Sequence, residues 1–225
     1  MARNKKVAII AVVVVLIAGA VTAYIRGRSL WHPIYVKITG GRSIQDAVGE
    51  IEKHMPELKD FDHKKINIIV YKEERVVKVV DQKVLCEFEM TAYSGNLGPK
   101  TGRGDGQIPE GIYRIVSLNP NSSYHLSLKI SYPNKVDLER CRRRNVADPG
   151  DDIYIHGKNT SDGCIAIGDR AIEMLFYMVN KAGKDNVKVI IVPSECYKHE
   201  YGESPNRELY DSIYHEVNAT LHFAQ

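Results

Sequence analysis

Residues 153–167, IYIHGKNTSDGCIAI, decide what this chain can fold into and what chemistry it can support. His156 ends a short apolar run, and Cys164 follows eight positions later in a loop of Gly, Ser and Asp. A free thiol is a weak nucleophile, so a reactive cysteine needs a base or a cation beside it. Imidazole titrates near neutral pH and is the usual base. The stretch therefore predicts Cys164 as a nucleophile with His156 as its general base.

Two glycines in the same stretch favour acyl-transfer chemistry. Gly157 and Gly163 let the backbone turn tightly and leave room for a substrate carbonyl beside main-chain N–H groups. Such N–H groups stabilise the oxyanion of an acyl-transfer intermediate. Because side chains alternate along a strand, Tyr154 shares a face with His156 and is a candidate substrate contact.

Structural interpretations of the same pair fit the sequence less well. A buried structural cysteine is disfavoured because Cys164 stands among glycines and polar residues. A zinc site usually takes four ligands in paired spacings, and the chain has no CxxC or HxxxH pair. We therefore expect neither a metal nor a cofactor. Cys86, Cys141 and Cys196 allow one disulfide in an oxidising compartment, and the sequence does not choose among the three pairings.

Composition indicates one good-sized domain with extensions and argues against a nucleic-acid partner. The chain has 225 residues and a formal net charge of +3. Segment 1–28 holds five basic residues and no acidic ones, which leaves 26 basic against 28 acidic residues in the rest. Nucleic-acid-binding domains are normally basic, so the slightly acidic body favours another class of partner.

The N-terminal segment is predicted to be a membrane anchor. Residues 7–25 are 19 uncharged residues preceded by Arg3, Lys5 and Lys6, and about 20 apolar residues span a bilayer as a helix. A cleaved signal peptide is the second interpretation, with a weak cleavage site at residues 18–20. Basic residues before the helix prefer the cytoplasm. Residues 1–28 are therefore expected to be a cytoplasmic tip and anchor, with the body in the periplasm.

We expect three segments in the rest of the chain: a helical neck at 29–63, a strand-rich body at 64–195 and a helical tail at 196–225. In the neck, Ser43 is a predicted N-cap and Pro56 ends the helix. Alternating apolar residues separated by turns predict largely antiparallel strands in the body. A glycine-rich loop, 94–109, interrupts them, and a helix capped by Asp169 follows the cysteine. The predicted strands are 66–70, 76–80, 84–93, 112–118, 124–130, 153–155 and 187–192.

A basic run at residues 140–144, expected in a loop, has two interpretations. The first is a solvated surface. The second is a wall formed by Arg142, Arg143 and Arg144 that attracts substrate carboxylates, since guanidinium groups pair with carboxylates bidentately.

Three ordered segments carry a family resemblance: LGPKTGRGDGQIPEGIYRI, YHLSLKISYPN and HGKNTSDGCIAI. Together they resemble the L,D-transpeptidase (YkuD-type) catalytic domain over residues 65–193. The short gap between HG and SxGC is similar to that of the YafK-like subgroup. The resemblance implies a β-rich α+β fold, with a mixed sheet or sandwich and one helix packed after the cysteine.

The same resemblance implies cysteine-dependent acyl transfer on peptidoglycan stem peptides. By position, Cys164 is the nucleophile and His156 the base, Ser161 and Gly163 belong to the signature loop, and the N–H groups of Gly163 and Cys164 form the oxyanion hole. The typical family pattern has Arg two residues after the cysteine. Ala166 stands there in this chain, as the YafK-like subgroup tends to have a small residue.

Two chemical outcomes remain open at this stage. A thioacyl-enzyme transferred to an amine gives a cross-link, whereas transfer to water gives hydrolysis. The YafK-like subgroup implies hydrolysis that frees a peptidoglycan-linked lipoprotein. The alternative from another class is an inactive peptidoglycan-binding scaffold, against which the intact set of His156, Ser161, Gly163 and Cys164 argues.

Overall fold

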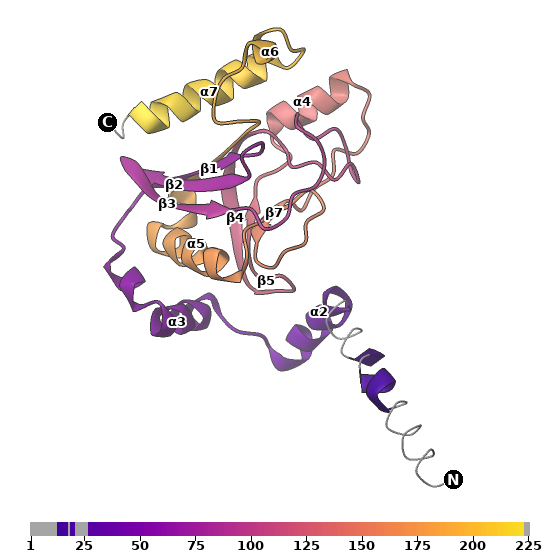
Figure 1. The fold of residues 1–225 in the computed structure, drawn as a ribbon, viewed down its shortest axis with the longest axis vertical. Coiled ribbons are helices and arrows are strands. Elements are labelled where there is room, and N and C mark those ends of the chain that lie inside the picture. The colour runs from indigo at the N-terminus through magenta and orange to yellow at the C-terminus, as the bar shows by residue number, and fades with distance from the viewer. Residues whose placement is uncertain (1–12, 18, 21–26, 223–225) are drawn as a thin grey trace. The chain divides into compact units, whose positions relative to one another are not determined.

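The computed structural model describes residues 13–17, 19–20 and 27–222 (Figure 1). The chain divides into two units, Met1–Arg42 and Ser43–Gln225. The second unit contains all the strands of the described part and every residue predicted to do chemistry.

The first unit contains helix α2, Arg28–Thr39, which ends where the N–H of Gly40 donates to the carbonyl of Val36. The predicted membrane anchor, residues 7–25, falls largely outside the described residues, and those that are described, 13–17 and 19–20, are helical. Among the residues that the structure covers, no helix combines the length and the apolar character needed to cross a bilayer.

Helix α3, Ile44–His54, starts as predicted at Ser43. The Ser43 hydroxyl accepts the Asp46 N–H, and the Asp46 carboxylate accepts the Ser43 N–H, which is a capping box. Pro56 opens the short helix η1, Pro56–Asp60. Ala47 and Ile51 of α3 are buried in the main core. The prediction of a separate neck is therefore wrong for this segment, because α3 packs in the core of the second unit.

The body is built on one mixed sheet of eight strands in the order β3-β2-β1-β8-β4-β5-β6-β7. Neighbouring strands are antiparallel except β1 with β8 and β6 with β7. The prediction of a mixed, β-rich α+β fold is confirmed. The strands are β1 Ile66–Tyr71, β2 Val76–Asp81, β3 Lys83–Glu89, β4 Gly111–Ser122, β5 His125–Ile130, β6 Tyr154–His156, β7 Ile165–Ala166 and β8 Val187–Val192.

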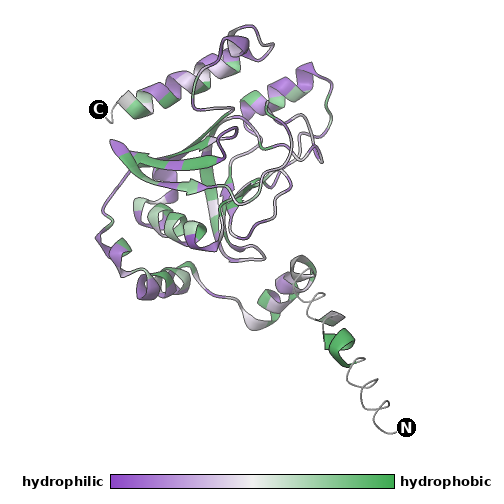
Figure 2. Ribbon diagram, viewed as in Figure 1, coloured by the Kyte–Doolittle hydropathy of each residue, from purple (hydrophilic) through white to green (hydrophobic). Residues whose placement is uncertain are grey.

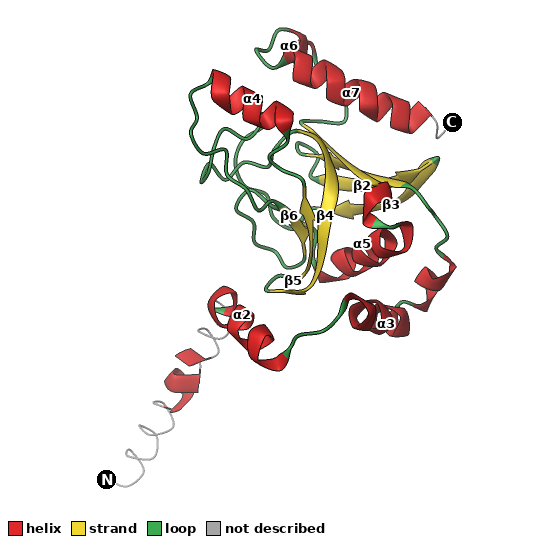
Figure 3. Cartoon of the chain, turned by 180° about the vertical axis from the view of Figure 1, so that it is seen from behind, coloured by secondary structure: helices red, strands yellow, loops and turns green. Residues whose placement is uncertain are grey.

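Strand β4 joins the two halves of the sheet. Its first residues, Gly111 to Arg114, pair with β8, and its pairing with β5 begins at Ile115. Figure 3 shows β4 as the long strand that runs from one half to the other. The register shifts after Ile115 and again after Asn119, and such irregularities bend a strand. The half formed by β5, β6 and β7 thereby folds away from the half formed by β1, β2, β3 and β8.

Strand β1 is buried on both of its faces. Ile68 and Val70 of β1 pack in a cluster with Phe176 of helix α5, Asp169–Ala182. Ile69 alternates with them and packs with Ile213 of helix α7, Arg207–His222. Side chains of a strand alternate between faces, so each face has its own helix. Figure 2 shows the hydrophobic strands between α5 and α7.

Two local predictions are wrong. The run 140–144, expected in a loop, mostly belongs to helix α4, Lys135–Arg143, which a capping box of Asn134 and Asp137 starts. Its buried residues are only Asp137 and Cys141, so the sequence shows no apolar stripe. The N-cap of α5 is Gly168 rather than Asp169. The two remaining short helices are η2 Lys184–Asn186 and α6 His199–Gly202.

Replacing Phe176 by alanine tests the packing of α5 on the sheet. Phe176 is fully buried, and removing a buried phenylalanine typically costs about 3–5 kcal/mol. We expect that loss in urea unfolding monitored by circular dichroism. The control Val116→Ala, at a side chain that is 47% exposed, should change the free energy of unfolding by less than about 1 kcal/mol. Equal losses in both variants would contradict this packing.

Candidate active site

The parallel pairing of β6 with β7 brings His156 and Cys164 together. Ile155 pairs with Ile165 and His156 with Ala166. One step back in this register, Cys164 lies beside Tyr154, so Tyr154, His156 and Cys164 share one face of the sheet. From a strand spacing of about 4.8 Å and a rise of about 3.3 Å per residue, the Cα atoms of His156 and Cys164 are about 8 Å apart. Their side chains can therefore meet.

Both side chains line one cavity of about 410 Å³. Its wall comes from the turn between β4 and β5, from β6 and from the cysteine loop, so it joins segments distant in sequence. Apart from the acidic Asp162, the wall is formed by side chains without a formal charge, which suits a peptide with its own amide groups. The lining residues are Asn119, Ser122, Ser123, Tyr124, Ser127, Tyr154, His156, Thr160, Ser161, Asp162 and Cys164.

His156 is held as a neutral base. It is 3% exposed, and its Nδ1 lies 2.6 Å from the carbonyl oxygen of Gly157. A carbonyl only accepts hydrogen bonds, so Nδ1 carries the hydrogen and Nε2 carries the lone pair. Burial lowers the pKa of His156 below its ordinary value, and the hydrogen bond to Gly157 opposes this. The Tyr124 ring packs against the imidazole with centroids 4.7 Å apart.

Cys164 is half-buried, and its thiol is held in the protonated form. The Sγ atom lies 3.7 Å from the carbonyl oxygen of Asp152. Burial raises the pKa of the thiol, while a backbone hydrogen bond from Tyr154 and the charge of Lys100 lower it in part. The resting site is thus a thiol beside a neutral imidazole, and a thiol of this kind must lose its proton to act as a nucleophile.

Gly157 is required by packing. A Cβ atom there would stand 2.6 Å from Asp169 Oδ1 and 2.8 Å from the carbonyl oxygen of Tyr124. The Asp169 carboxylate also accepts the N–H of Lys158 at 2.8 Å and pairs with its ammonium group. The bare backbone at Gly157 lets β5 and the start of α5 close around His156.

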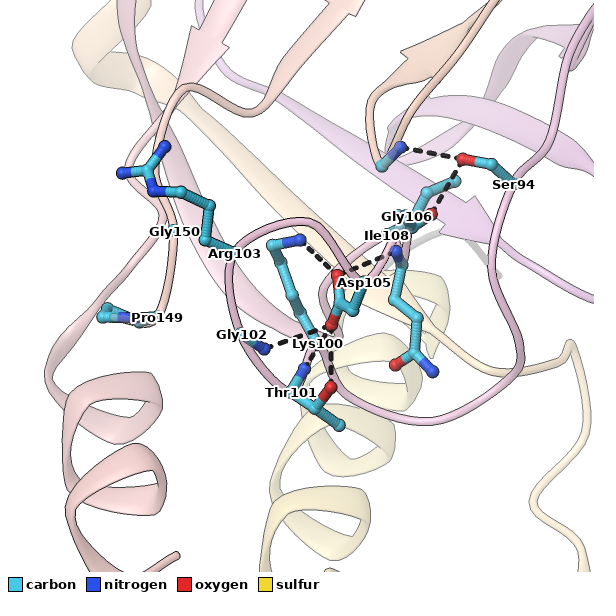
Figure 4. Close-up of polar contacts among 12 residues, drawn as sticks. Ser94, Lys100, Thr101, Gly102, Arg103, Asp105, Gly106, Ile108, Pro149 and Gly150 are labelled. Carbon is cyan, nitrogen blue, oxygen red and sulfur yellow. Dashed lines mark hydrogen bonds and ion pairs between the residues drawn. The ribbon is translucent and has the colours of Figure 1, made fainter. Parts of the chain in front are cut away.

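The N–H of Gly163 bonds to the glycine-rich loop. Its φ of +84° favours glycine, but its N–H donates to the hydroxyl of Ser94 at 2.8 Å. Figure 4 shows this hydroxyl donating in turn to the carbonyl of Gly106. Neither Gly163 nor Ser94, both described, lines the cavity. The Gly163 N–H is therefore bonded to Ser94 in this geometry, and the oxyanion-hole roles of the Gly163 and Cys164 N–H groups stay predictions.

Ser161 and Tyr154 have clear positions. The Ser161 hydroxyl donates to the carbonyl of Cys164 at 2.5 Å and closes the cysteine loop. Tyr154 lines the cavity, and its hydroxyl lies 3.2 Å from Asp152 Oδ1, to which it donates. Both remain predicted site residues.

The structure does not bring Arg142, Arg143 or Arg144 to Cys164. Arg142 and Arg143 pair with Glu139 on the surface of α4. Arg143 and Arg144 line a second cavity of about 670 Å³, between α4 and α7. None of the three lines the cavity that holds His156 and Cys164. Their interpretation as a wall that binds substrate carboxylates therefore has no support from this geometry.

Ala166 stands where the usual family pattern has Arg, and it lies in the interior of the site. Its side chain is fully buried, between His156 on β6 and a bridge to Ala92. Its carbonyl accepts the N–H of Thr91 at 2.8 Å. A small, fully buried residue therefore stands at this position of the site.

All four cysteines are free, so none of the three disulfides that the sequence allowed is present. Sequence reasoning also missed Ser94, Lys100 and Asp105, which support the cysteine loop. They stand in or beside the segment LGPKTGRGDGQIPEG, whose resemblance to the family was the only signal for them.

Comparison with known proteins identifies the family of this chain. The family model described as "YkuD: L,D-transpeptidase catalytic domain" matches residues 65–191, more than half of the chain. The chain belongs to this family. The matched span contains His156, Cys164 and the glycine-rich loop, so the resemblance deduced from sequence is confirmed.

Relatives support the YafK-like subgroup. The protein named "Putative L,D-transpeptidase YafK" from Escherichia coli K12 is 35% identical over 138 residues, which cover 57% of this chain and 54% of that protein. Its counterpart in strain O157:H7 matches equally well. The chain thus spans about half the length of these curated relatives.

Solved structures with a similar fold include the helical cell shape determining protein Pgp2 from Campylobacter jejuni. Its identity is 21% and its TM-score 0.46, over 79% of this chain and 64% of that one. L,D-transpeptidase 1 from Mycobacterium tuberculosis has 15% identity and a TM-score of 0.35, over 57% of this chain and 62% of that one.

Exchanging single glycines for alanine tests the packing around His156. Gly157→Ala should destabilise the protein by about 1–3 kcal/mol, because its new Cβ meets a carboxylate and a carbonyl. The matched control is Gly49→Ala in α3, where nothing lies within 4 Å of an added Cβ. It should be neutral or stabilise the helix by up to about 1 kcal/mol. Thermal unfolding measures both changes, and a Gly157→Ala variant as stable as Gly49→Ala would refute the close approach.

The pH dependence of alkylation tests the resting protonation of Cys164. Because burial raises the pKa of the thiol, its reaction with iodoacetamide should accelerate only above the ordinary titration range of a cysteine, about pH 8.5. Peptide mapping by mass spectrometry separates Cys164 from the other three cysteines. An inflection near or below pH 7 would reveal a preformed thiolate–imidazolium pair instead.

Proposed function

We propose that this chain is a cysteine-dependent acyltransferase that acts on peptidoglycan stem peptides outside the cytoplasm. The observation that carries the proposal is the shared cavity of Cys164 and a His156 whose Nε2 bears a lone pair. Nucleophilic catalysis needs a nucleophile and its base within reach of the same reacting atom. Membership of the YkuD family supports peptidoglycan as the substrate class.

The proposed reaction proceeds through a thioacyl-enzyme. His156 Nε2 takes the thiol proton as Cys164 Sγ attacks the carbonyl of the L-configured centre of a stem diamino acid. The tetrahedral intermediate collapses, the carbon–nitrogen bond breaks, and His156 returns the proton to the leaving amine. An acceptor then attacks the thioester, with His156 again serving as base.

The intermediate needs donors for its oxyanion. The Cys164 N–H is the proposed main-chain donor, and hydroxyl groups of the wall, such as those of Ser127 and Tyr124, line the same space. Loss of one oxyanion donor typically costs about 100- to 1000-fold in rate.

The acceptor decides the outcome. An amine gives a new cross-link, and water gives hydrolysis, which includes release of a peptidoglycan-linked lipoprotein. Asp162 is the acidic side chain of the wall and would attract an amino group of either the diamino acid or the acceptor. Location outside the cytoplasm, by an anchor or by secretion, rests on residues 7–25 and is part of the proposal.

A muropeptide assay tests the function. The full chain, incubated with purified muropeptides, should yield cleaved or exchanged stem peptides by mass spectrometry. Cys164→Ala should abolish these products. Cys196→Ala, which removes an exposed cysteine outside the cavity, should leave the rate unchanged. Absence of product with the wild type, or undiminished product with Cys164→Ala, would favour an inactive peptidoglycan-binding scaffold.

The pH profile of the rate tests His156 as the base. The protonated imidazole cannot accept the thiol proton, so activity falls as pH drops through the pKa of His156. That pKa is lowered by burial, so the acid limb should lie below about pH 6.5. His156→Gln should reduce the rate by about 100-fold or more at every pH. An acid limb above pH 7 in the wild type would exclude a buried neutral base.

A further inference from the structure

The glycine-rich loop is organised around one carboxylate. Asp105 Oδ2 accepts the N–H groups of Thr101 at 2.6 Å and Gly102 at 3.2 Å, and the Thr101 hydroxyl at 3.0 Å. Asp105 Oδ1 accepts the N–H of Gln107 at 3.0 Å and pairs with the Lys100 ammonium group. Figure 4 shows these donors converging on Asp105. Residues 100–107 are thereby closed into a ring.

Two charged groups of this ring, Lys100 and Asp105, are paired and largely buried. Lys100 is 4% exposed. Burial raises the pKa of Asp105, but the Lys100 ammonium and the N–H donors outweigh it and bring the pKa down to about 2. The Asp105 carboxylate is therefore ionised at every pH at which the protein would work. Asp105 accepts more hydrogen bonds than closing the loop would require.

A second buried ion pair fixes the base of the loop. Lys72 Nζ donates to the carbonyls of Gly98 and Ile108, each at 2.8 Å, and to Glu110 Oε1 at 2.9 Å. Lys72 and Glu110 have fully buried side chains. The loop that starts after β3 is thus tied to the sheet at both ends, and its ring cannot drift from the cysteine loop.

The far side of the ring lies directly against the cysteine loop. A Cβ atom on Gly163 would stand 3.1 Å from the carbonyl oxygen of Gln107, and one on Gly106 would stand 3.3 Å from Asp162 Oδ1. Ser94 adds the hydrogen-bonded link between the Gly163 N–H and the Gly106 carbonyl. The Gly106–Gln107 backbone therefore supports the two residues that precede Cys164.

We propose that Lys100 and Asp105 are the positioning pair of the nucleophile: Asp105 holds the Gly106–Gln107 backbone against Gly163, and the buried Lys100 holds Asp105 in place. The inference rests on the proposed function, in which Cys164 must become an anion-like nucleophile. The charge of Lys100 acts on the sulfur in the direction that favours the thiolate. The charge of Lys100 thus offsets part of the cost of forming a thiolate in a buried site.

Two charge-removing variants should shift the thiol in opposite directions. Lys100→Gln keeps a donor for Asp105 but removes the positive charge, so the alkylation pKa of Cys164 should rise by about 1 pH unit. Asp105→Asn leaves the Lys100 charge without its partner, so that pKa should fall by a similar amount. Both variants should lower kcat on muropeptides about 10-fold or more, with KM changed less, because neither residue lines the cavity. If the two residues only stabilised the fold, the two variants would not shift the alkylation pKa of Cys164 in opposite directions.

Arg103→Gln is the matched control. Arg103 is a cation of the same ring, but its side chain is 57% exposed and pairs with Asp148 and Asp151 on the surface. Its removal should leave the alkylation profile of Cys164 unchanged. Circular dichroism checks the fold of all three variants.

The outcomes separate this inference from the proposed function. Alkylation requires no substrate, so opposite shifts support the pair even if muropeptides are not turned over. Unchanged or parallel shifts in Lys100→Gln and Asp105→Asn overturn the inference even if the wild type is active. Unfolding of either charge variant while Arg103→Gln stays folded also overturns it, since that residue would then serve the fold rather than the thiol.

Discussion

The pairing of two very short strands is the constraint on which the rest of the site depends. β6 has three residues and β7 has two, and their parallel register sets His156 beside Ala166. A slip of one residue would turn Cys164 to the opposite face of the sheet. The register is secured on both sides, because Ile155 and Ile165 are buried in the core and Ala166 also bonds to Thr91. The catalytic geometry is therefore a consequence of core packing.

Burial explains the electrostatics of the site. Removing a thiolate and an imidazolium from water is costly, so a buried pair rests in its neutral form. The hydrogen bond from His156 Nδ1 to Gly157 fixes the tautomer with the lone pair on Nε2. The ring of residues 100–107, which holds Lys100 and Asp105, lies outside the lining of the cavity. The groups that stabilise the cysteine loop thus lie outside the cavity, and the groups proposed to react line it.

Much of this could be deduced from sequence where a pattern had a direct physical cause. The alternation in β1, β2 and β8, the cap at Ser43 and the spacing of His156 and Cys164 all had such causes. Helix α4 was missed because only Asp137 and Cys141 are buried on it. The hydrogen bond from the Gly163 N–H to Ser94 was missed because Ser94 stands 69 residues earlier in the chain. Long-range hydrogen bonds of this kind leave no local pattern.

The protonation state of His156 is the quantity that most directly tests whether the site rests as a thiol beside a neutral base. Nitrogen-15 NMR of the imidazole in the full chain distinguishes the two nitrogens and their protonation. At pH 7 we predict a hydrogen on Nδ1 and none on Nε2, with the signal assigned by its loss in His156→Gln. Protonation of both nitrogens at that pH, or a hydrogen on Nε2 alone, would contradict the neutral thiol–imidazole site.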